Sequence, residues 1–137
     1  MSAPYSAIRS AFATKLQAFA GLPNVAWENV PFTPATGAPY LQPVLLPGEP
    51  TQAEIGVNGL NRHTGIYQIS VFAPTGTGIS ALNTLVGNLC DHFKRGTTLY
   101  YAPVLVNIKK AYPGPAMQET DWVHVPITVQ YTALAAN

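Results

Sequence analysis

Residues 122–131, WVHVPITVQY, alternate apolar and polar side chains more cleanly than any other segment of the chain. Every second residue from Val123 to Tyr131 is apolar, and His, Pro, Thr and Gln stand between them. Successive side chains of a strand point to opposite faces of its sheet, so this pattern predicts a strand with one buried and one solvated face. Burial of one face only is typical of antiparallel sheets.

Shorter segments predict the strands that accompany this one. Residues 67–71 and 104–108 alternate in the same way, and a short strand is expected near Val25. Residues 40–46 also have the composition of a strand, which is interrupted by Pro43. Because proline cannot donate a ladder hydrogen bond, we expect this strand at an edge of the sheet or at a bulge.

Two segments carry apolar residues at helical spacing. The first runs from about residue 4 to about residue 20 and is followed by Gly21, which suits a helix end. The second covers residues 82–93. Lys94 and Arg95 suit the negative end of its dipole, and Gly96 is expected at the C′ position.

Together these elements predict an α+β fold. The sheet is mainly antiparallel or mixed, two helices pack on one of its faces, and long loops connect the elements. Residues 47–62 and 112–121 are expected to be polar or Pro/Gly-rich connections, as is the proline-rich segment 32–39. The length of 137 residues is that of one domain, so we expect residues 1–137 to form a single domain.

The composition restricts the classes of partner. Charged residues make up only 9% of the chain, and seven basic residues against six acidic ones give a formal charge of +1. Proteins that bind nucleic acid mainly through phosphates usually show a clear basic excess. The two basic pairs, Lys94-Arg95 and Lys109-Lys110, are interpreted as solvated ends of elements. A surface with so few charges indicates either that much of it consists of polar loop groups or that part of it contacts other protein.

No segment approaches the roughly 20 apolar residues that a membrane span requires. The first ten residues, MSAPYSAIRS, have neither the charged start nor the continuous apolar run of a secretory signal. We therefore expect no membrane association and a chain that stays in the cytoplasm where it is made.

The segment PTGTGIS, residues 74–80, suggests a phosphate-binding turn between a strand and a helix. However, neither Gly76 nor Gly78 is followed by the lysine of a P-loop, and position 81 is alanine where a dinucleotide motif needs a third glycine. We interpret the segment as a tight turn in which Thr77 or Ser80 caps the second helix.

Candidate catalytic and metal-binding residues are few. His63, His92 and His124 stand far apart and show no ligand spacing, and Glu119 and Asp121 flank one residue of a loop. The single cysteine, Cys90, is expected to be a small core residue. These residues predict neither an enzyme nor a cofactor, and a small nucleotide- or metal-binding domain remains the less favoured alternative.

Four stretches together resemble a known family. They are YSAIRSAF (5–12), GLPNVAWENVPFTPATGAPYLQPVLLPGEP (21–50), GIYQISVFAPTGTGISALN (65–83) and GPAMQETDWVHVPITVQY (114–131). In this order they resemble the tail terminator proteins of long-tailed bacteriophages, and the similarity covers nearly the whole chain. A neck adaptor, or head–tail joining protein, is the alternative within the same class.

The resemblance implies a structural virion protein without catalytic residues. Such subunits form rings, usually hexamers, that sit on the last ring of the tail tube, stop its growth and offer a surface to the head connector. It further implies assembly in the host bacterial cytoplasm, a place in the tail or neck of the virion, and passage of DNA through the ring without specific binding.

The long loops are the expected assembly elements, because a neighbouring subunit can complete unpaired backbone and flexible segments. The alternative is that they are plain solvent-exposed connections. The candidate interface residues are Glu49, Gln52, Glu54, Asn58, Asn61, Arg62, Met117, Gln118 and Glu119.

Overall fold

The computed structural model describes residues 5–28, 30–34, 37–56, 59–76, 79–101 and 104–136. Its two helices are α1 (Tyr5–Gln17) and α2 (Ser80–His92). Its strands are β1 (Asn24–Val25), β2 (Tyr40–Pro47), β3 (Thr51–Gln52), β4 (Leu60–Pro74), β5 (Thr98–Tyr101), β6 (Val104–Pro113), β7 (Met117–Gln118) and β8 (Trp122–Ala136). The predicted α+β class is confirmed.

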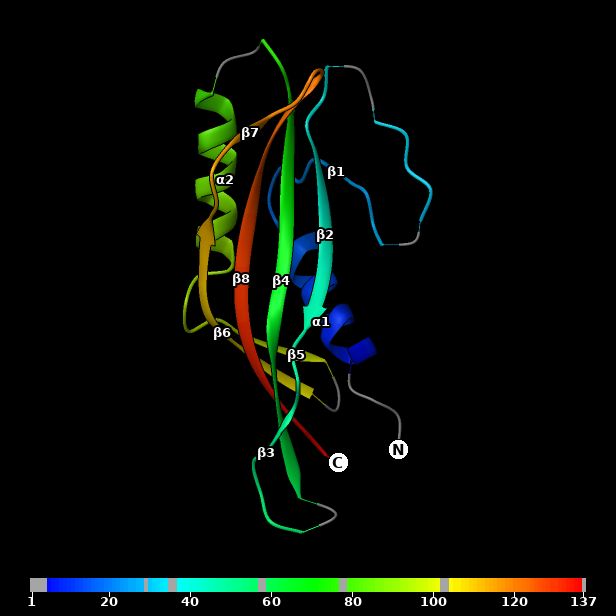
Figure 1. The fold of residues 1–137 in the computed structure, drawn as a ribbon, viewed down its shortest axis with the longest axis vertical. Coiled ribbons are helices and arrows are strands. Elements are labelled where there is room, and N and C mark those ends of the chain that lie inside the picture. The colour runs from blue at the N-terminus through cyan, green and yellow to red at the C-terminus, as the bar shows by residue number, and fades with distance from the viewer. Residues whose placement is uncertain are drawn as a thin grey trace.

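The described strands form one mixed sheet in the order β1-β2-β4-β8-β6-β5, with β3 paired to β4 and β7 paired to β8. Only the short β1–β2 pair is parallel. The centre is the pair β4–β8, whose register runs without interruption from Leu60↔Ala136 to Pro74↔Trp122. Figure 1 shows these two strands as the long, curved axis of the molecule.

Both helices cover the same face of the sheet, behind the strands in Figure 1. Helix α1 contacts β5 and β6, and α2 contacts β4, β6 and β8. Phe12 of α1 is fully buried and stacks on Tyr67 of β4, with ring centroids 4.4 Å apart and planes 9° apart. The edge of Tyr131 from β8 meets the same ring at 5.4 Å, so one aromatic cluster joins α1 to the two central strands.

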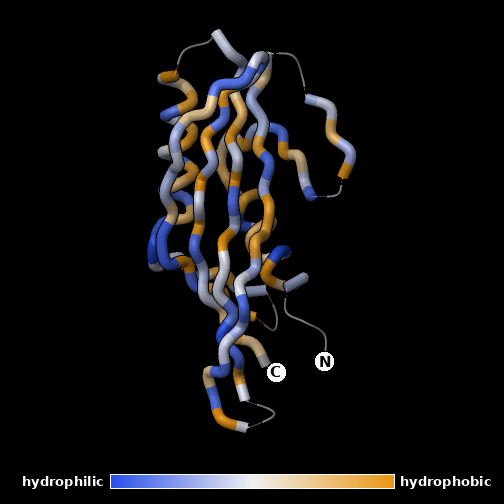
Figure 2. Tube along the Cα trace, in the orientation of Figure 1, coloured by the Kyte–Doolittle hydropathy of each residue, from blue (hydrophilic) through white to orange (hydrophobic). Residues whose placement is uncertain are grey.

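The alternation predicted for residues 122–131 is confirmed. Val125, Ile127, Val129 and Tyr131 are each at most 4% exposed. The residues between them face away from the helices and are half-buried. Figure 2 shows the same alternation of apolar and polar residues along the central strands. The helix-covered face is therefore the core, and the other face of the sheet has no helix of the described residues on it.

Several element boundaries differ from the sequence-based expectation. Strand β4 starts at Leu60 rather than at residue 67, because its polar first half pairs with β8 on one side and with β2 and β3 on the other. Strand β5 was not predicted at all, since TLYY shows no regular alternation of polar and apolar residues. Helix α1 ends at Gln17, three residues before the expected end.

The end of α2 also differs. Its C-cap is Phe93, so Gly96 lies three residues further on and not at C′. Gly96 has a φ of 88° and donates a hydrogen bond from its N–H to the Ile108 carbonyl at 3.0 Å. Its left-handed backbone therefore serves the turn into the sheet rather than the helix end.

The start of α2 lacks the expected cap. Ile79 occupies the N-cap position without a side-chain hydrogen bond, and Ser80 is the first helical residue. Ser80 is therefore not the cap, while the other candidate, Thr77, lies outside the described residues, as does Gly78.

Candidate assembly surfaces

Residues 47–62 form an arm rather than a plain connection. Strand β3 pairs with the start of β4 through Thr51↔Arg62 and Gln52↔Asn61. Figure 1 shows this arm projecting beyond the body of the molecule at the end opposite the β7–β8 turn. Side chains secure its tip, because Glu54 Oε1 accepts from the Leu60 N–H at 3.0 Å. The predicted polar loop is therefore in part an ordered extension of the sheet.

Five of the candidate interface residues lie on this arm or at its base, namely Glu49, Gln52, Glu54, Asn61 and Arg62. Two of them also stabilise it, since Gln52 Nε2 donates to the Glu54 carbonyl at 2.9 Å and the Glu54 carboxylate binds the Leu60 N–H. Asn58 lies outside the described residues.

The sequence analysis did not identify Ile55 at the tip of the arm. Its side chain is 97% exposed, the highest value among the exposed large apolar residues of the described chain. The signal in the sequence was an isoleucine in a mainly polar segment that also contains Val57 and Leu60. A single exposed apolar side chain is normal on a protein surface, so Ile55 by itself does not identify an interface.

The remaining candidates, Met117, Gln118 and Glu119, lie at the other end of β8. Met117 pairs with His124, and Gln118 pairs with Val123. At about 3.3 Å per residue, the 15 residues of β8 separate this turn from the arm by roughly 50 Å. The structure therefore does not bring the two predicted sets together, but places them at opposite ends of one subunit.

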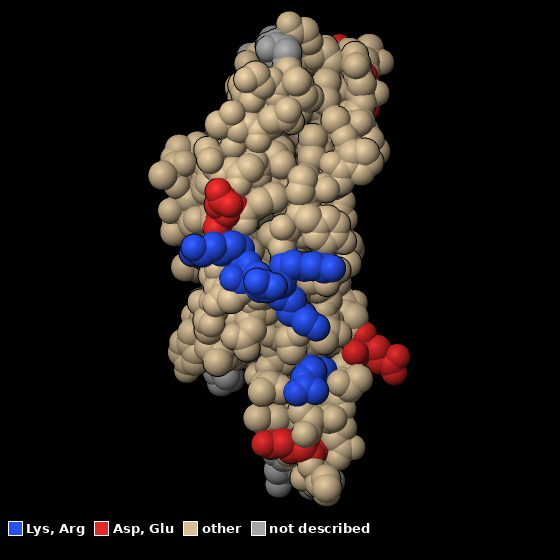
Figure 3. Space-filling model, turned by 90° about the vertical axis from the view of Figure 1, so that its left-hand side faces the viewer, with Lys and Arg blue, Asp and Glu red and all other residues tan. Residues whose placement is uncertain are grey.

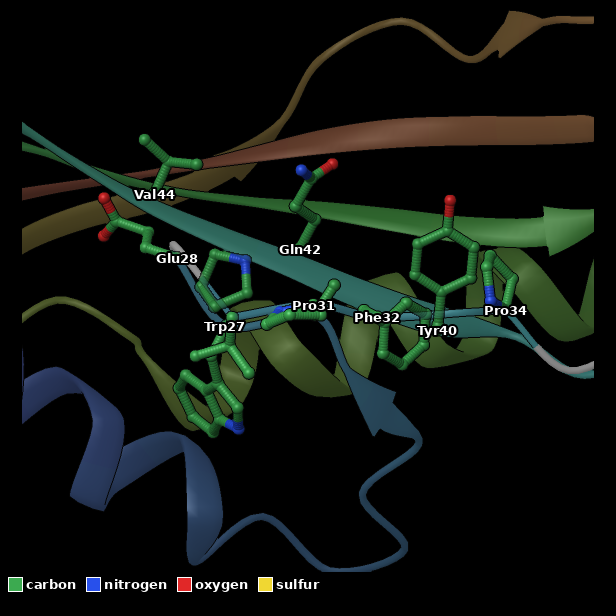
Figure 4. A pocket seen from close by; sticks show the side chains of 11 residues that line it. Trp27, Glu28, Pro31, Phe32, Pro34, Tyr40, Gln42 and Val44 are labelled. Atoms are coloured by element: carbon green, nitrogen blue, oxygen red, sulfur yellow. The ribbon is translucent and has the colours of Figure 1, made fainter.

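An open pocket of about 530 Å³ lies between β2 and the segment that follows β1. Figure 4 shows Trp27, Phe32 and Tyr40 with several prolines around it. Its residues are Ala26, Trp27, Glu28, Val30, Pro31, Phe32, Pro34, Tyr40, Gln42, Pro43 and Val44. The expected loop 32–39 thus contributes Phe32 and Pro34 to a hollow beside the sheet edge whose lining is mixed polar and apolar.

The β2 edge next to this pocket is closed to an added strand. The Leu41 carbonyl accepts from the Ala26 N–H at 2.7 Å, so the backbone at Leu41 faces away from β4. Pro43 faces the same way two residues later and has no N–H. The N–H of Leu45, the next residue with this orientation, donates to Glu28 Oε1 at 3.1 Å. Pro43 lies at an edge as predicted, and the β2–β4 register shows no bulge there.

An aromatic ladder crosses the uncovered face of the sheet at the end near β7. Tyr40 stacks on Phe72 at 4.6 Å, and Phe72 faces His124 at 4.9 Å. His124 Nδ1 lies 3.1 Å from Glu119 Oε1. Burial and the Glu119 charge raise the pKa of Tyr40. These cross-strand pairs join β2, β4 and β8.

Chemically reactive side chains do not converge in the described part of the chain. His63 is 5% exposed and meets Tyr5 edge-on at 5.7 Å, and burial lowers its pKa. Burial, assisted by Asp91, raises the pKa of the Cys90 thiol. A nucleophilic cysteine needs the opposite shift.

The other two histidines lie elsewhere, because His92 Nε2 is 2.6 Å from the Lys15 carbonyl and His124 belongs to the aromatic ladder. Among the described residues, no group of three or more His, Cys, Asp or Glu side chains is placed to hold a metal ion.

The glycine-rich turn after β4 lies beside a second hollow. Its lining residues are Pro74, Gly76, Ile79, Ala116, Gln118 and Val123, and none of them is basic. The turn is tied to the β7–β8 connection, since the Thr75 N–H donates to the Asp121 carbonyl at 3.1 Å. The described lining of this hollow therefore contains no cation.

The described helices include none that is both long enough and apolar enough to span a bilayer.

The described residues thus form a curled sheet with an uncovered face and a projecting arm. The chain belongs to the phage tail terminator protein family, whose model matches residues 7–131. It is therefore a structural protein of the bacteriophage tail. The resemblance found in the sequence is confirmed.

Solved structures share the fold. One aligns with a TM-score of 0.77 at 24% identity, covering 97% of this chain and 96% of its own. Another, from the virion of a native gene transfer agent particle, aligns with a TM-score of 0.65 at 18% identity, covering 98% of this chain and all of its own. No curated protein matches.

Proposed function

We propose that this chain is a tail terminator that forms a ring of six copies on the last ring of the tail tube. The ring stops tube growth and presents its other face to the head connector. The observation that carries this proposal is the family match over residues 7–131. Residues 1–137 act as one domain in it, which the continuous core from α1 to β8 supports.

The surfaces of the subunit support a ring. A closed ring needs two different patches on each subunit and a rotation that returns to the start. The closed β2 edge argues against strand addition at that edge of the sheet. The arm with Glu49, Gln52, Glu54, Asn61 and Arg62, and the turn with Met117, Gln118 and Glu119, lie at opposite ends of β8. They are the proposed contacts with neighbours, tube and connector.

The ring assembles in the host cytoplasm and becomes part of the virion. It is not an enzyme in this proposal, and DNA passes through its channel without specific binding. The formal charge of +1 supports the last point, because tight binding through phosphates requires a basic excess.

Negative-stain electron microscopy of the purified chain, alone and mixed with tail tubes, tests the proposal. Closed rings that cap one end of each tube are the expected result. A chain that binds the portal side of the neck and leaves tube ends open would instead identify a neck adaptor. A rise in melting temperature with a nucleotide or divalent metal would favour a ligand-binding domain.

A further inference from the structure

Charges are distributed unevenly along the chain. Residues 94–110 contain four cations and no carboxylate, namely Lys94, Arg95, Lys109 and Lys110. Residues 16–61 contain three carboxylates, Glu28, Glu49 and Glu54, and no Lys or Arg. One segment thus carries a net charge of +4 and the other a net charge of −3.

The fold brings the four cations together. The turn that follows α2 is bonded to β6, because the Gly96 N–H donates to the Ile108 carbonyl at 3.0 Å and the Ile108 N–H donates to the Thr97 carbonyl at 2.9 Å. Lys94-Arg95 therefore lies beside Lys109-Lys110. Figure 3 shows Lys and Arg side chains gathered across the middle of this side of the molecule. We call these four residues the basic patch.

A bulge in β6 turns both lysines outward. The pairing of β6 with β8 shifts register between Ile108 and Lys110. In a regular strand the neighbours Lys109 and Lys110 would point to opposite faces, and one of them would point toward the core. Here Ile108 is 2% exposed while both lysines are exposed, and Lys110 Nζ lies 5.5 Å from the centroid of the Tyr112 ring.

Among the described residues no carboxylate forms an ion pair with the basic patch, although Asp91 stands three residues before Lys94 and an acidic side chain borders the patch in Figure 3. The described residues include all six Asp and Glu side chains, and their ion pairs within 4.0 Å are Arg9–Glu28 and His124–Glu119. Four exposed cations without a carboxylate partner repel one another unless a partner molecule supplies negative charge.

The acidic segment lies at the opposite edge of the sheet. Strands β1 and β2 end the strand order on one side, and β6 and β5 end it on the other. Glu28 is occupied by Arg9 and the Leu45 N–H. Glu49 and Glu54 are exposed on the arm after β2, where Glu54 also accepts from the Leu60 N–H and Arg62 lies opposite Thr51. We call Glu49 and Glu54 the acidic edge.

We propose that the basic patch of one copy docks against the acidic edge of a second copy of this chain. Two complementary patches on opposite edges make a head-to-tail contact that repeats around a ring. The proposal rests on the proposed function, because it assumes the ring and names its contact. Duplex DNA is the less suitable partner, because the whole chain carries only +1.

The test is a charge swap on the full chain, with ring formation followed by native mass spectrometry and analytical ultracentrifugation at low salt. Reversal of the patch with K94E/R95E/K109E/K110E raises the concentration of half-assembly by about tenfold. Reversal of the edge with E49K/E54Q raises it equally, and the new amide oxygen can still accept from the Leu60 N–H. The sixfold variant carrying both reversals returns to within about threefold of wild type, because the complementary signs are restored. The single changes K15E and K109E alter the net charge equally, and only K109E weakens assembly. Circular dichroism checks that each variant is folded.

If each reversal variant forms rings as readily as the wild type, the patch-to-edge contact is overturned but the ring itself is not. A wild-type chain that stays monomeric yet caps tubes would also overturn it, whereas a chain that does neither would overturn the proposed function as well. Duplex DNA binding that K109E/K110E abolishes, with rings unaffected, would assign the basic patch to nucleic acid instead.

Discussion

The aromatic cluster around Phe12 allows a quantitative prediction of stability. Phe12 is fully buried, stacks on Tyr67 at 4.4 Å and contacts Phe93 and Tyr131 at 6.1 and 5.4 Å between centroids. Removing a buried phenylalanine costs about 3–5 kcal/mol of unfolding free energy. Because this ring joins α1 to both central strands, we expect F12A to cost about 4 kcal/mol.

Substitution of Phe12 by leucine separates the stability contributed by buried apolar volume from that contributed by aromatic stacking. F12L keeps most of the apolar volume and loses an aromatic pair that is worth about 0.5–1.5 kcal/mol. We therefore expect F12L to cost about 1.5 kcal/mol. A matched control is Y100A on β5, where the side chain is 68% exposed and its removal costs less than about 1 kcal/mol.

The assay is urea denaturation followed by far-ultraviolet circular dichroism, at a protein concentration below that of self-assembly. This condition matters because association would add apparent stability by mass action. A loss below about 2 kcal/mol for F12A, or equal losses for F12A and F12L, would refute the assignment of Phe12 as the packing centre between α1 and the sheet.

Three further predictions concern polar and glycine positions. The lowered pKa of His63 means that the unfolded chain binds a proton more readily than the folded chain. Stability therefore falls as the pH drops through the ordinary value of 6.5, and H63Q flattens this dependence in denaturation series between pH 7.5 and 5. E28A costs about 1–2 kcal/mol because it leaves the Leu45 N–H without its acceptor, while E28Q costs less than about 0.5 kcal/mol; equal losses in urea denaturation would contradict this reading. A Cβ at Gly65 would lie 2.7 Å from the Leu46 carbonyl oxygen and from the Tyr131 hydroxyl, so G65A costs about 1–3 kcal/mol. Adding Y131F relieves part of that cost in a double-mutant cycle, and strict additivity would argue against the close contact.

The parts of the fold that were predicted correctly are those with a local periodic signal. Residues 122–131 show a two-residue period and form the first part of β8, where alternate residues are buried in the core. Residues 82–93 show a helical period and correspond to α2. Pro43 was assigned to an edge because its missing N–H is a property of the residue itself. Each of these signals depends on side chains within a few residues of one another.

The elements that were missed have no such signal. Strand β3 has two residues, and the first half of β4 is polar, so neither is recognisable before its partner is known. Strand β5 depends on pairing with β6 and on contact with α1. The candidate interface residues were chosen from loop length alone, and the structure separates them into an arm and a distant turn.

By itself, the sequence determined the class of fold, the core-facing residues of the main elements, the low content of charged residues and the family. These follow from composition and from periods of two or 3.6 residues, which are local properties of the chain. Only the tertiary structure decided that residues 47–62 form an arm and that Lys94-Arg95 lies beside Lys109-Lys110, on the edge opposite Glu49 and Glu54. The physical reason is that strand order and a single register shift in β6 bring distant residues together, and neither has a signature in the residues themselves.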